Sequence, residues 1–378
     1  MPHILSLAEH YLLPFIAVIS VVVFVHEFGH YWVARRCGIR VLSFSIGFGA
    51  PLFSWTDKHG TRWQVAWLPL GGYVKMFGDT NPASVPDESV KEMTEEEKKV
   101  SFFYQPVNKR IAVVAAGPAF NYLFAILVLS LLFMFQGERF STPVISELQE
   151  NGVAAHAGLL PGDKIVSIDG EHIDSFEDIQ RIISLNAGTP VSFAIERNNA
   201  PQVIDLTPEV SVQTDRIGGE HHMGKIGIVS KNIEYKKWPP LTAVKQATIE
   251  TWKLSASTLR AVGQMILGAR ASDEIGGPLR IAQMSSEIVK DGFFAFVWFM
   301  AIISINLGLV NLFPVPLLDG GHLLFYTFEK LFGHPLTEKT QEVGFRIGLT
   351  LVVCLMVFAT WNDLVHLGVI SSIRALFS

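Results

Sequence analysis

The alternation of apolar and polar segments divides the chain into membrane and water-exposed parts. The first apolar stretch begins without Lys or Arg and has no small-residue cleavage site, so we expect it to be retained and not removed as a signal peptide. Four stretches approach the roughly 20 residues that a helix needs to cross a bilayer. They are Tyr11 to Ala34, Ile111 to Phe135, Phe293 to Phe313 and Ile347 to Leu367. The pattern predicts an α-helical polytopic membrane protein with about four transmembrane helices.

Between the first two spans the pattern changes to that of strands. Residues 42–46 and 61–67 alternate as expected for β-strands, and Asp57 to Gly60 has the composition of a turn. We therefore predict a membrane-associated β-hairpin at about 41–74, within a first region of residues 1–136. The hairpin is either a structural element that dips into the membrane or a strand edge that receives an extended substrate.

Between the second and third spans the chain has a soluble pattern. Residues 137–225 combine short alternating strands with a helical stretch at Phe176 to Ser184. The segment AGLLPGDKIVSIDG, residues 157–170, resembles the PDZ family. This resemblance implies one inserted β-rich domain that binds a peptide or a carboxyl-terminal tail beside an edge strand. We expect amphipathic connecting helices at 226–292, and the last two spans at 293–378.

The distribution of basic residues predicts the orientation. Residues 1–10 contain no Lys or Arg, whereas pairs of basic residues flank the loop between the first two spans, at Arg35-Arg36 and Lys109-Arg110. Basic loops stay in the cytoplasm. The PDZ-like segment is then expected on the periplasmic side of a bacterial inner membrane, and the end of the first span on the cytoplasmic side.

Composition narrows the class of partner. A chain that is 49% hydrophobic and 17% charged fits a protein in contact with the lipid bilayer that also carries one water-exposed domain. The net charge of −5, without a basic arm or an aromatic-basic stripe, predicts no nucleic-acid partner. Cys37 and Cys354 flank different spans and do not make a disulfide framework.

Candidate chemistry lies inside the first span, in the run His26-Glu27-Phe28-Gly29-His30. Histidines four residues apart face the same side of a helix and can bind one Zn²⁺. Glu27, next to the first histidine, can take a proton from a metal-activated water. Because ionisable groups are costly in hydrocarbon, their presence there indicates a functional site.

A catalytic zinc usually has three protein ligands, so this motif needs one more donor. Asp319 is the best candidate, because Pro314 and Pro316 interrupt the third span just before it. Irregular backbone at membrane depth is tolerated where it lines a cavity. His322 is the competing donor, although its place after two glycines favours a packing or supporting role.

The second span contains Gly117, Pro118 and Asn121 in an apolar run. A proline in the middle of a helix removes a hydrogen bond, so we expect Pro118 to break the hydrogen-bond ladder of this span. Asn121 can either join helices by hydrogen bonding or help to shape the active site.

In this order the motifs resemble the site-2 protease family of intramembrane zinc metalloproteases, of the bacterial sigma-E regulator type. The matching elements cover nearly the whole chain: the HEFGH run, Gly117-Pro118 with Asn121, the PDZ-like segment, and residues 311–320. The chain departs from the well-known enterobacterial members in having room for one PDZ domain and not two. Substrate access or its regulation is therefore expected to differ, while the chemistry is expected to be the same.

The resemblance implies regulated intramembrane proteolysis. The expected reaction is hydrolysis of a peptide bond within or near the transmembrane segment of a single-span membrane protein, such as a pre-cleaved anti-sigma factor or a signal-peptide remnant. It implies Zn²⁺ on His26, His30 and Asp319, with Glu27 as the general base. Asn311 would lie near the active site, where it either binds substrate or packs between helices.

Two other functions compete with proteolysis in the membrane. A non-proteolytic membrane scaffold would bind peptide tails through its PDZ domain, but its structural zinc would need four protein ligands and would have no need for Glu27. A membrane-anchored metallopeptidase acting on soluble peptides would carry the metal motif on its soluble domain. The position of His26 and His30 within a span argues against this last function.

Overall fold

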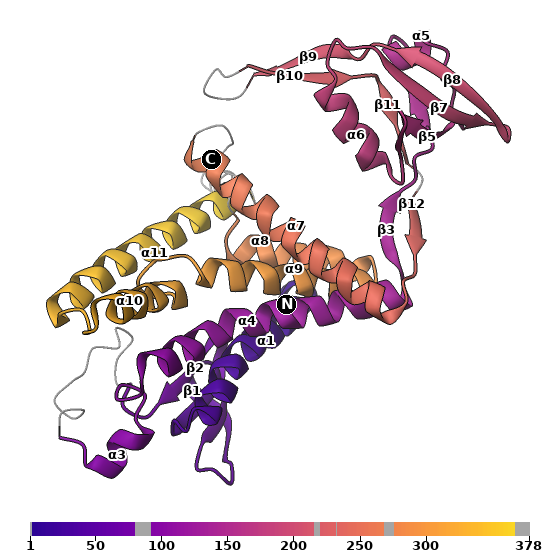
Figure 1. Cartoon of the computed structure of the whole chain (residues 1–378). Coiled ribbons are helices and arrows are strands. Elements are labelled where there is room, and N and C mark those ends of the chain that lie inside the picture. Colours follow the sequence, from indigo (N-terminus) through magenta and orange to yellow (C-terminus); the bar gives the residue numbers. More distant parts are fainter. Residues whose placement is uncertain (1, 80–91, 215–219, 232, 268–275, 367–378) are drawn as a thin grey trace, which may run out of the picture. The chain divides into compact units, whose positions relative to one another are not determined.

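The computed structural model describes residues 2–79, 92–214, 220–231, 233–267 and 276–366. The chain divides into two compact units. The first comprises residues 1–130, 244–259 and 273–378, and the second comprises residues 131–243 and 260–272. Figure 1 labels the helices and strands in chain order.

The first unit contains the predicted spans. In the described part of the chain, four helices are long and apolar enough to cross a membrane: α1 (Pro2–Arg36), α4 (Val107–Phe135), α9 (Phe293–Asn311) and α11 (Glu338–His366). They confirm the four predicted spans. The last helix begins earlier than its apolar stretch, because the polar residues before Ile347 are good helix formers. The predicted end at Leu367 lies outside the described residues.

Helix α4 continues through Pro118, so the hydrogen bond that the proline removes does not interrupt the span. Proline removes one backbone donor, but it still permits helical dihedral angles. Packed neighbouring helices can satisfy or shield the freed carbonyl in a membrane protein. Pro118 therefore changes one hydrogen bond and leaves the span intact.

The predicted hairpin is confirmed, with a more folded shape than expected. Strand β1 (Val41–Thr56) is antiparallel to β2 (Arg62–Met76) around a turn at residues 57–61. Both strands bend, so residues 43–46 of β1 pair on one side with residues 62–65 and on the other with residues 72–75. Gly47 in β1, with φ of 87°, and Gly71 in β2, with φ of 110°, take up backbone angles at these bends that other residues avoid.

The turn of this hairpin is tied to α1 through Asp57. Its carboxylate accepts hydrogen bonds from the Tyr31 hydroxyl at 3.2 Å and from Trp63 Nε1 at 3.0 Å. The stacked rings of Phe44 and Trp63 pack beside it. Large apolar side chains are exposed elsewhere on the hairpin, as a membrane-associated element requires: Phe48, Leu52, Phe53, Trp55 and Trp67.

Shorter helices complete the first unit. They are α3 (Glu95–Val100), α8 (Pro278–Lys290) and α10 (Asp319–Phe332). Helix α8 packs on α1 and α9, and the buried carboxylate of Asp363 in α11 caps its amino end. That carboxylate accepts hydrogen bonds from the backbone N–H groups of Gly277, Leu279 and Arg280. The long helix α7 (Pro240–Ile266) and helix α8 both lie within residues 226–292, where connecting helices are expected.

The second unit has the predicted β-rich pattern. Its main sheet has the strand order β6-β5-β7-β8, formed by Glu171–His172, Lys164–Ile168, Val191–Arg197 and Ala200–Leu206. Helix α6 (Phe176–Leu185) confirms the predicted helical stretch, and α5 (Val153–His156) is a single turn. Both helices contribute to one core, in which Ile165, Ile168 and Phe193 are completely buried.

The remaining strands of this unit form three small antiparallel pairs. Strand β3 (Glu138–Ser141) pairs with β12 (Ile233–Lys236), and β4 (Glu147–Leu148) pairs with β11 (Ile228–Val229). Strand β9 (Glu209–Thr214) pairs with β10 (Glu220–Lys225). The β3–β12 pair brings the two ends of the β-rich segment together.

Candidate metal centre

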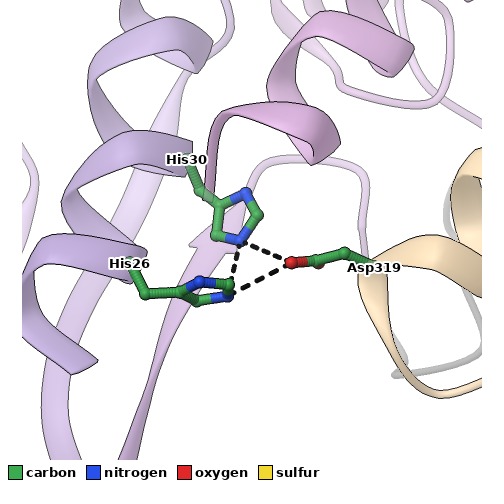
Figure 2. Close-up of side chains that lie close together, drawn as sticks. All are labelled: His26, His30 and Asp319. Atoms are coloured by element: carbon green, nitrogen blue, oxygen red, sulfur yellow. Dashed lines mark hydrogen bonds and ion pairs between the residues drawn. The ribbon is translucent and has the colours of Figure 1, made fainter. Parts of the chain in front are cut away.

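Two histidines of α1 form one side of the site. His26 and His30 lie one helical turn apart and are 7% and 8% exposed. Their Nε2 atoms are 3.3 Å apart. Figure 2 shows both rings pointing from α1 toward the same spot. The four-residue spacing in the sequence is sufficient to produce this arrangement on a helix.

Asp319 forms the other side and is the first residue of α10. The chain reaches it by folding back tightly after α9 ends at Asn311. A Cβ on Gly320 would stand 2.2 Å from the Phe313 carbonyl oxygen, so only glycine fits there. Leu317 has a φ of 95°, a strained angle for a residue with a branched side chain. Strain of this kind is common where a fold holds a functional side chain in place.

The three side chains converge on one another (Figure 2). Asp319 Oδ2 lies 3.2 Å from His26 Nε2 and 3.4 Å from His30 Nε2. This buried oxygen makes no hydrogen bond. Ligand atoms held about 2.0–2.1 Å from a tetrahedral zinc stand about 3.3–3.4 Å from one another. The donor atoms therefore have the types and separations that suit one Zn²⁺.

The outer nitrogen of each ring has a buried partner. His30 Nδ1 lies 2.9 Å from the Val113 carbonyl oxygen, which can only accept, so Nδ1 carries the hydrogen and Nε2 keeps a lone pair for a metal. His26 Nδ1 lies 3.2 Å from the side-chain amide of Asn121, which is completely buried in α4. Sequence reasoning left the role of Asn121 open. In the sequence, the only indication that Asn121 has a special role is the presence of an amide in an apolar run.

A cavity of about 290 Å³ adjoins the three donors. Glu27 lines it and lies against β2, since a Cβ on Gly72 would be 3.1 Å from Glu27 Cγ. Asn311, the last residue of α9, and His322 of α10 also line this cavity. Among the described residues, the group of donors close enough to share one metal contains His26, His30 and Asp319 and does not include His322.

Comparison with known proteins gives the family. The model of peptidase family M50 matches residues 14–355, which is most of the chain. The chain belongs to peptidase family M50. This is the site-2 protease family, and the protein is an intramembrane metalloprotease of that type. Membership of a peptidase family favours proteolysis over the scaffold hypothesis.

Relatives of this M50 peptidase are similar along almost their whole length. A protein of Agrobacterium fabrum, provisionally named a zinc metalloprotease, is 44% identical over 94% of this chain and 95% of its own length. The metalloprotease MmpA of Caulobacter vibrioides is 37% identical over 96% of this chain and 97% of its own. The regulator of sigma E protease of Salmonella typhi is 32% identical over 92% of this chain and 97% of its own.

The alignment with the Salmonella typhi protein runs over 450 residues, more than the 378 of this M50 peptidase. That relative therefore contains a segment without a counterpart here. Among solved structures, a PDZ domain from Listeria monocytogenes aligns with 24% of this chain and 90% of its own, at 20% identity and a TM-score of 0.20.

Proposed function

We propose that the protein hydrolyses a peptide bond within or near the transmembrane segment of a single-span membrane protein, with His26, His30 and Asp319 as the ligands of one Zn²⁺. The observation that carries this proposal is the convergence of three buried donor atoms, 3.2–3.4 Å apart, two of them on a helix that is long and apolar enough to cross the membrane. Two imidazole nitrogens and a carboxylate oxygen at these separations are a donor set that suits a catalytic Zn²⁺ site.

A bound Zn²⁺ would lower the pKa of a water molecule and polarise the scissile carbonyl. Glu27 takes the proton from the attacking water while the water oxygen bonds to the carbonyl carbon. The same carboxyl group then gives the proton to the departing amine nitrogen as the carbon–nitrogen bond breaks. Glu27 lines the same cavity as the three donors, and this shared position supports both roles.

Asn311 is proposed to bind the substrate backbone. Its side chain lines the same cavity as Glu27, at the point where α9 ends and the chain turns toward Asp319. An amide here can donate a hydrogen bond to the carbonyl oxygen of the scissile bond, on which negative charge develops during attack. A helical substrate exposes that oxygen only after it unwinds locally.

We infer that β2 receives the unwound substrate as an added strand. Gly72, Tyr73 and Val74 line the cavity. Residues 72–75 pair with β1 on one side, and within the described part of the chain no strand pairs with their other side. An unpaired strand edge beside the proposed metal site offers backbone hydrogen bonds to an extended peptide. The β-rich second unit is proposed to dock a peptide or a carboxyl-terminal tail of the substrate.

The proposed orientation places the second unit on the periplasmic side of a bacterial inner membrane and the metal centre toward the cytoplasm. Basic residues support it. Arg35 and Arg36 are in the last turn of α1, five and six residues beyond the metal motif, and Lys109 and Arg110 lie in the first turn of α4. Such clusters mark the cytoplasmic ends of spans.

Glu27→Gln is the test of this proposal. The amide cannot accept the proton, so cleavage of a membrane-spanning reporter is expected to fall by at least about 100-fold. Zinc content should remain that of the wild type, because Glu27 is not among the three donors. Glu150→Gln, at an exposed position of the second unit, is the matched control and should cleave normally. Unchanged cleavage by Glu27→Gln would refute the assigned role of Glu27.

A further inference from the structure

Asn121 is a buried amide whose hydrogen bonds are incomplete as the side chain is oriented. Its side chain is completely buried in α4. Nδ2 lies 3.2 Å from His26 Nδ1, and Oδ1 has no hydrogen-bond partner. A buried carbonyl oxygen without a donor costs roughly 1–3 kcal/mol. An orientation that gives Oδ1 a donor removes this cost.

Exchange of the two amide atoms supplies that donor. Oxygen and nitrogen of an asparagine amide occupy nearly the same space, and their hydrogen-bond network decides which is which. With Oδ1 toward His26, the Nδ1–H of the ring donates to it. This tautomer leaves the lone pair on Nε2, the atom that faces His30 and Asp319. In the opposite orientation Nδ2 donates to Nδ1, and the ring hydrogen is on Nε2, where it blocks a metal.

The other histidine shows the same arrangement in a fixed form. His30 Nδ1 faces the backbone carbonyl of Val113, which can never act as a donor. In this orientation, the Nδ1 atom of each proposed histidine ligand faces a hydrogen-bond acceptor of α4. For His30 the acceptor is a backbone carbonyl, and for His26 it is a side-chain amide oxygen. Partners of this type set the tautomer and the ring direction of metal-binding histidines.

Contacts with helix α9 hold Asn121 in position. Ser304 Oγ of α9 donates to the Asn121 backbone carbonyl at 3.0 Å. A Cβ on Gly308 of α9 would stand 3.2 Å from Asn121 Cβ, so the two helices are in close contact here. These contacts fix the backbone and Cβ of Asn121, from which the amide reaches His26.

We propose that Asn121 is the positioning residue of His26: its Oδ1 accepts the Nδ1–H hydrogen bond that makes Nε2 available to the metal. This inference rests on the proposed metal centre. It assigns the amide of the second span a role beyond joining helices. The group required at this position is a hydrogen-bond acceptor, and its donor half is dispensable.

Two substitutions distinguish a role of Asn121 as a hydrogen-bond acceptor from a role in packing alone. Asn121→Asp keeps an acceptor toward His26 and removes the donor, whereas Asn121→Leu keeps the approximate shape and removes both. Zinc affinity would be measured on the purified full chain by competition with a chromogenic chelator. The absorption bands of Co²⁺ added in place of zinc would report the ligand geometry. Asn121→Leu is expected to weaken zinc binding 10–100-fold. Asn121→Asp should stay within about threefold of the wild type, because a carboxylate is a common partner of such a histidine.

Ser130→Ala is the control, since it removes a buried side-chain hydrogen bond to the Ile126 carbonyl in the same helix, α4, that does not involve Asn121. It should bind zinc like the wild type. Equal affinity in Asn121→Leu and the wild type, or equal loss in the Leu and Asp variants, would overturn the proposal. If the Leu variant does not fold, Asn121→Ala makes the same comparison with a smaller side chain. A wild-type protein that binds no zinc would instead refute the proposed metal centre.

Discussion

Gly117 of α4 lies directly against the ring of His30. A Cβ at position 117 would stand 2.3 Å from His30 Nε2 and 2.8 Å from His26 Cε1, closer than any real contact. The atoms of this glycine therefore form a wall of the proposed metal centre. The second span does more than fill space between its neighbours, because its backbone sets how far the two rings can move.

We predict that Gly117→Ala disrupts the site. The new methyl group must push the His30 ring away from its position, because the opposing atoms belong to the ring itself. Displacement of a catalytic group by about 1 Å can cost about 100-fold in rate, and a loss of that order is expected in reporter cleavage. Gly263→Ala is the control, since nothing lies within 4 Å of a Cβ at that helical position. A Gly117→Ala enzyme with normal cleavage would contradict the geometry.

The choice between Asp319 and His322 as the third ligand can be tested by metal analysis. Asp319→Ala is expected to weaken zinc binding by more than about 100-fold, since loss of a supporting partner alone costs 10–100-fold. His322→Ala should retain its zinc, because His322 lines the cavity but does not belong to the group of converging donors. The reverse result, with zinc lost only from His322→Ala, would transfer the ligand role to the histidine.

The orientation can be tested by labelling single cysteines. In a variant that lacks Cys37 and Cys354, we predict that Gln202→Cys on β8 reacts with a membrane-impermeant maleimide in intact spheroplasts. Glu96→Cys on α3 should react only after the membrane is opened. Both positions are exposed, so a difference between them reports the side of the membrane. Labelling of Glu96→Cys in intact spheroplasts would reverse the proposed topology.

The second unit contains an ion pair that predicts how its stability depends on pH. Asp163 is 1% exposed, and its two carboxylate oxygens accept hydrogen bonds from Arg197 at 2.7 Å. Burial by itself raises the pKa of this carboxyl group, but the hydrogen bonds from Arg197 and from the Leu160 N–H outweigh burial and hold the pKa below its usual range. The ionised form therefore stabilises the fold above the unfolded-state pKa of about 4. This contribution is lost as the pH falls below that value.

Arg197→Met should consequently move the acid unfolding of this unit to higher pH. The buried carboxylate of Asp163 loses its partner, so its folded-state pKa rises and the stabilising difference from the unfolded state shrinks. Hydrogen exchange of residues 164–206 in the full chain, followed from pH 7 to pH 3, measures the shift. Arg181→Met, which removes a half-exposed pair with Glu171, should leave the profile unchanged. Identical profiles for both variants would contradict the role of Asp163.

The sequence by itself determined the features that depend on local pattern. The length of each apolar run predicts a span, and alternation predicts β1 and β2 on either side of the Asp57 turn. The spacing of His26 and His30 is set by helix geometry, and two prolines end the third span before Asp319. Each of these follows from residues close together in the chain, so no knowledge of packing is needed.

Only the tertiary structure decided which distant residues meet. Pro118 does not break α4, because packing outweighs the loss of one hydrogen bond. Asp319 faces the two histidines, while His322, three residues later, does not join them, and this depends on the tight fold of the chain around Gly320. The place of Asn121 behind His26 depends on how α4 is rotated against α1. Such rotation arises from the close packing of many side chains on several helices, which no single stretch of sequence specifies.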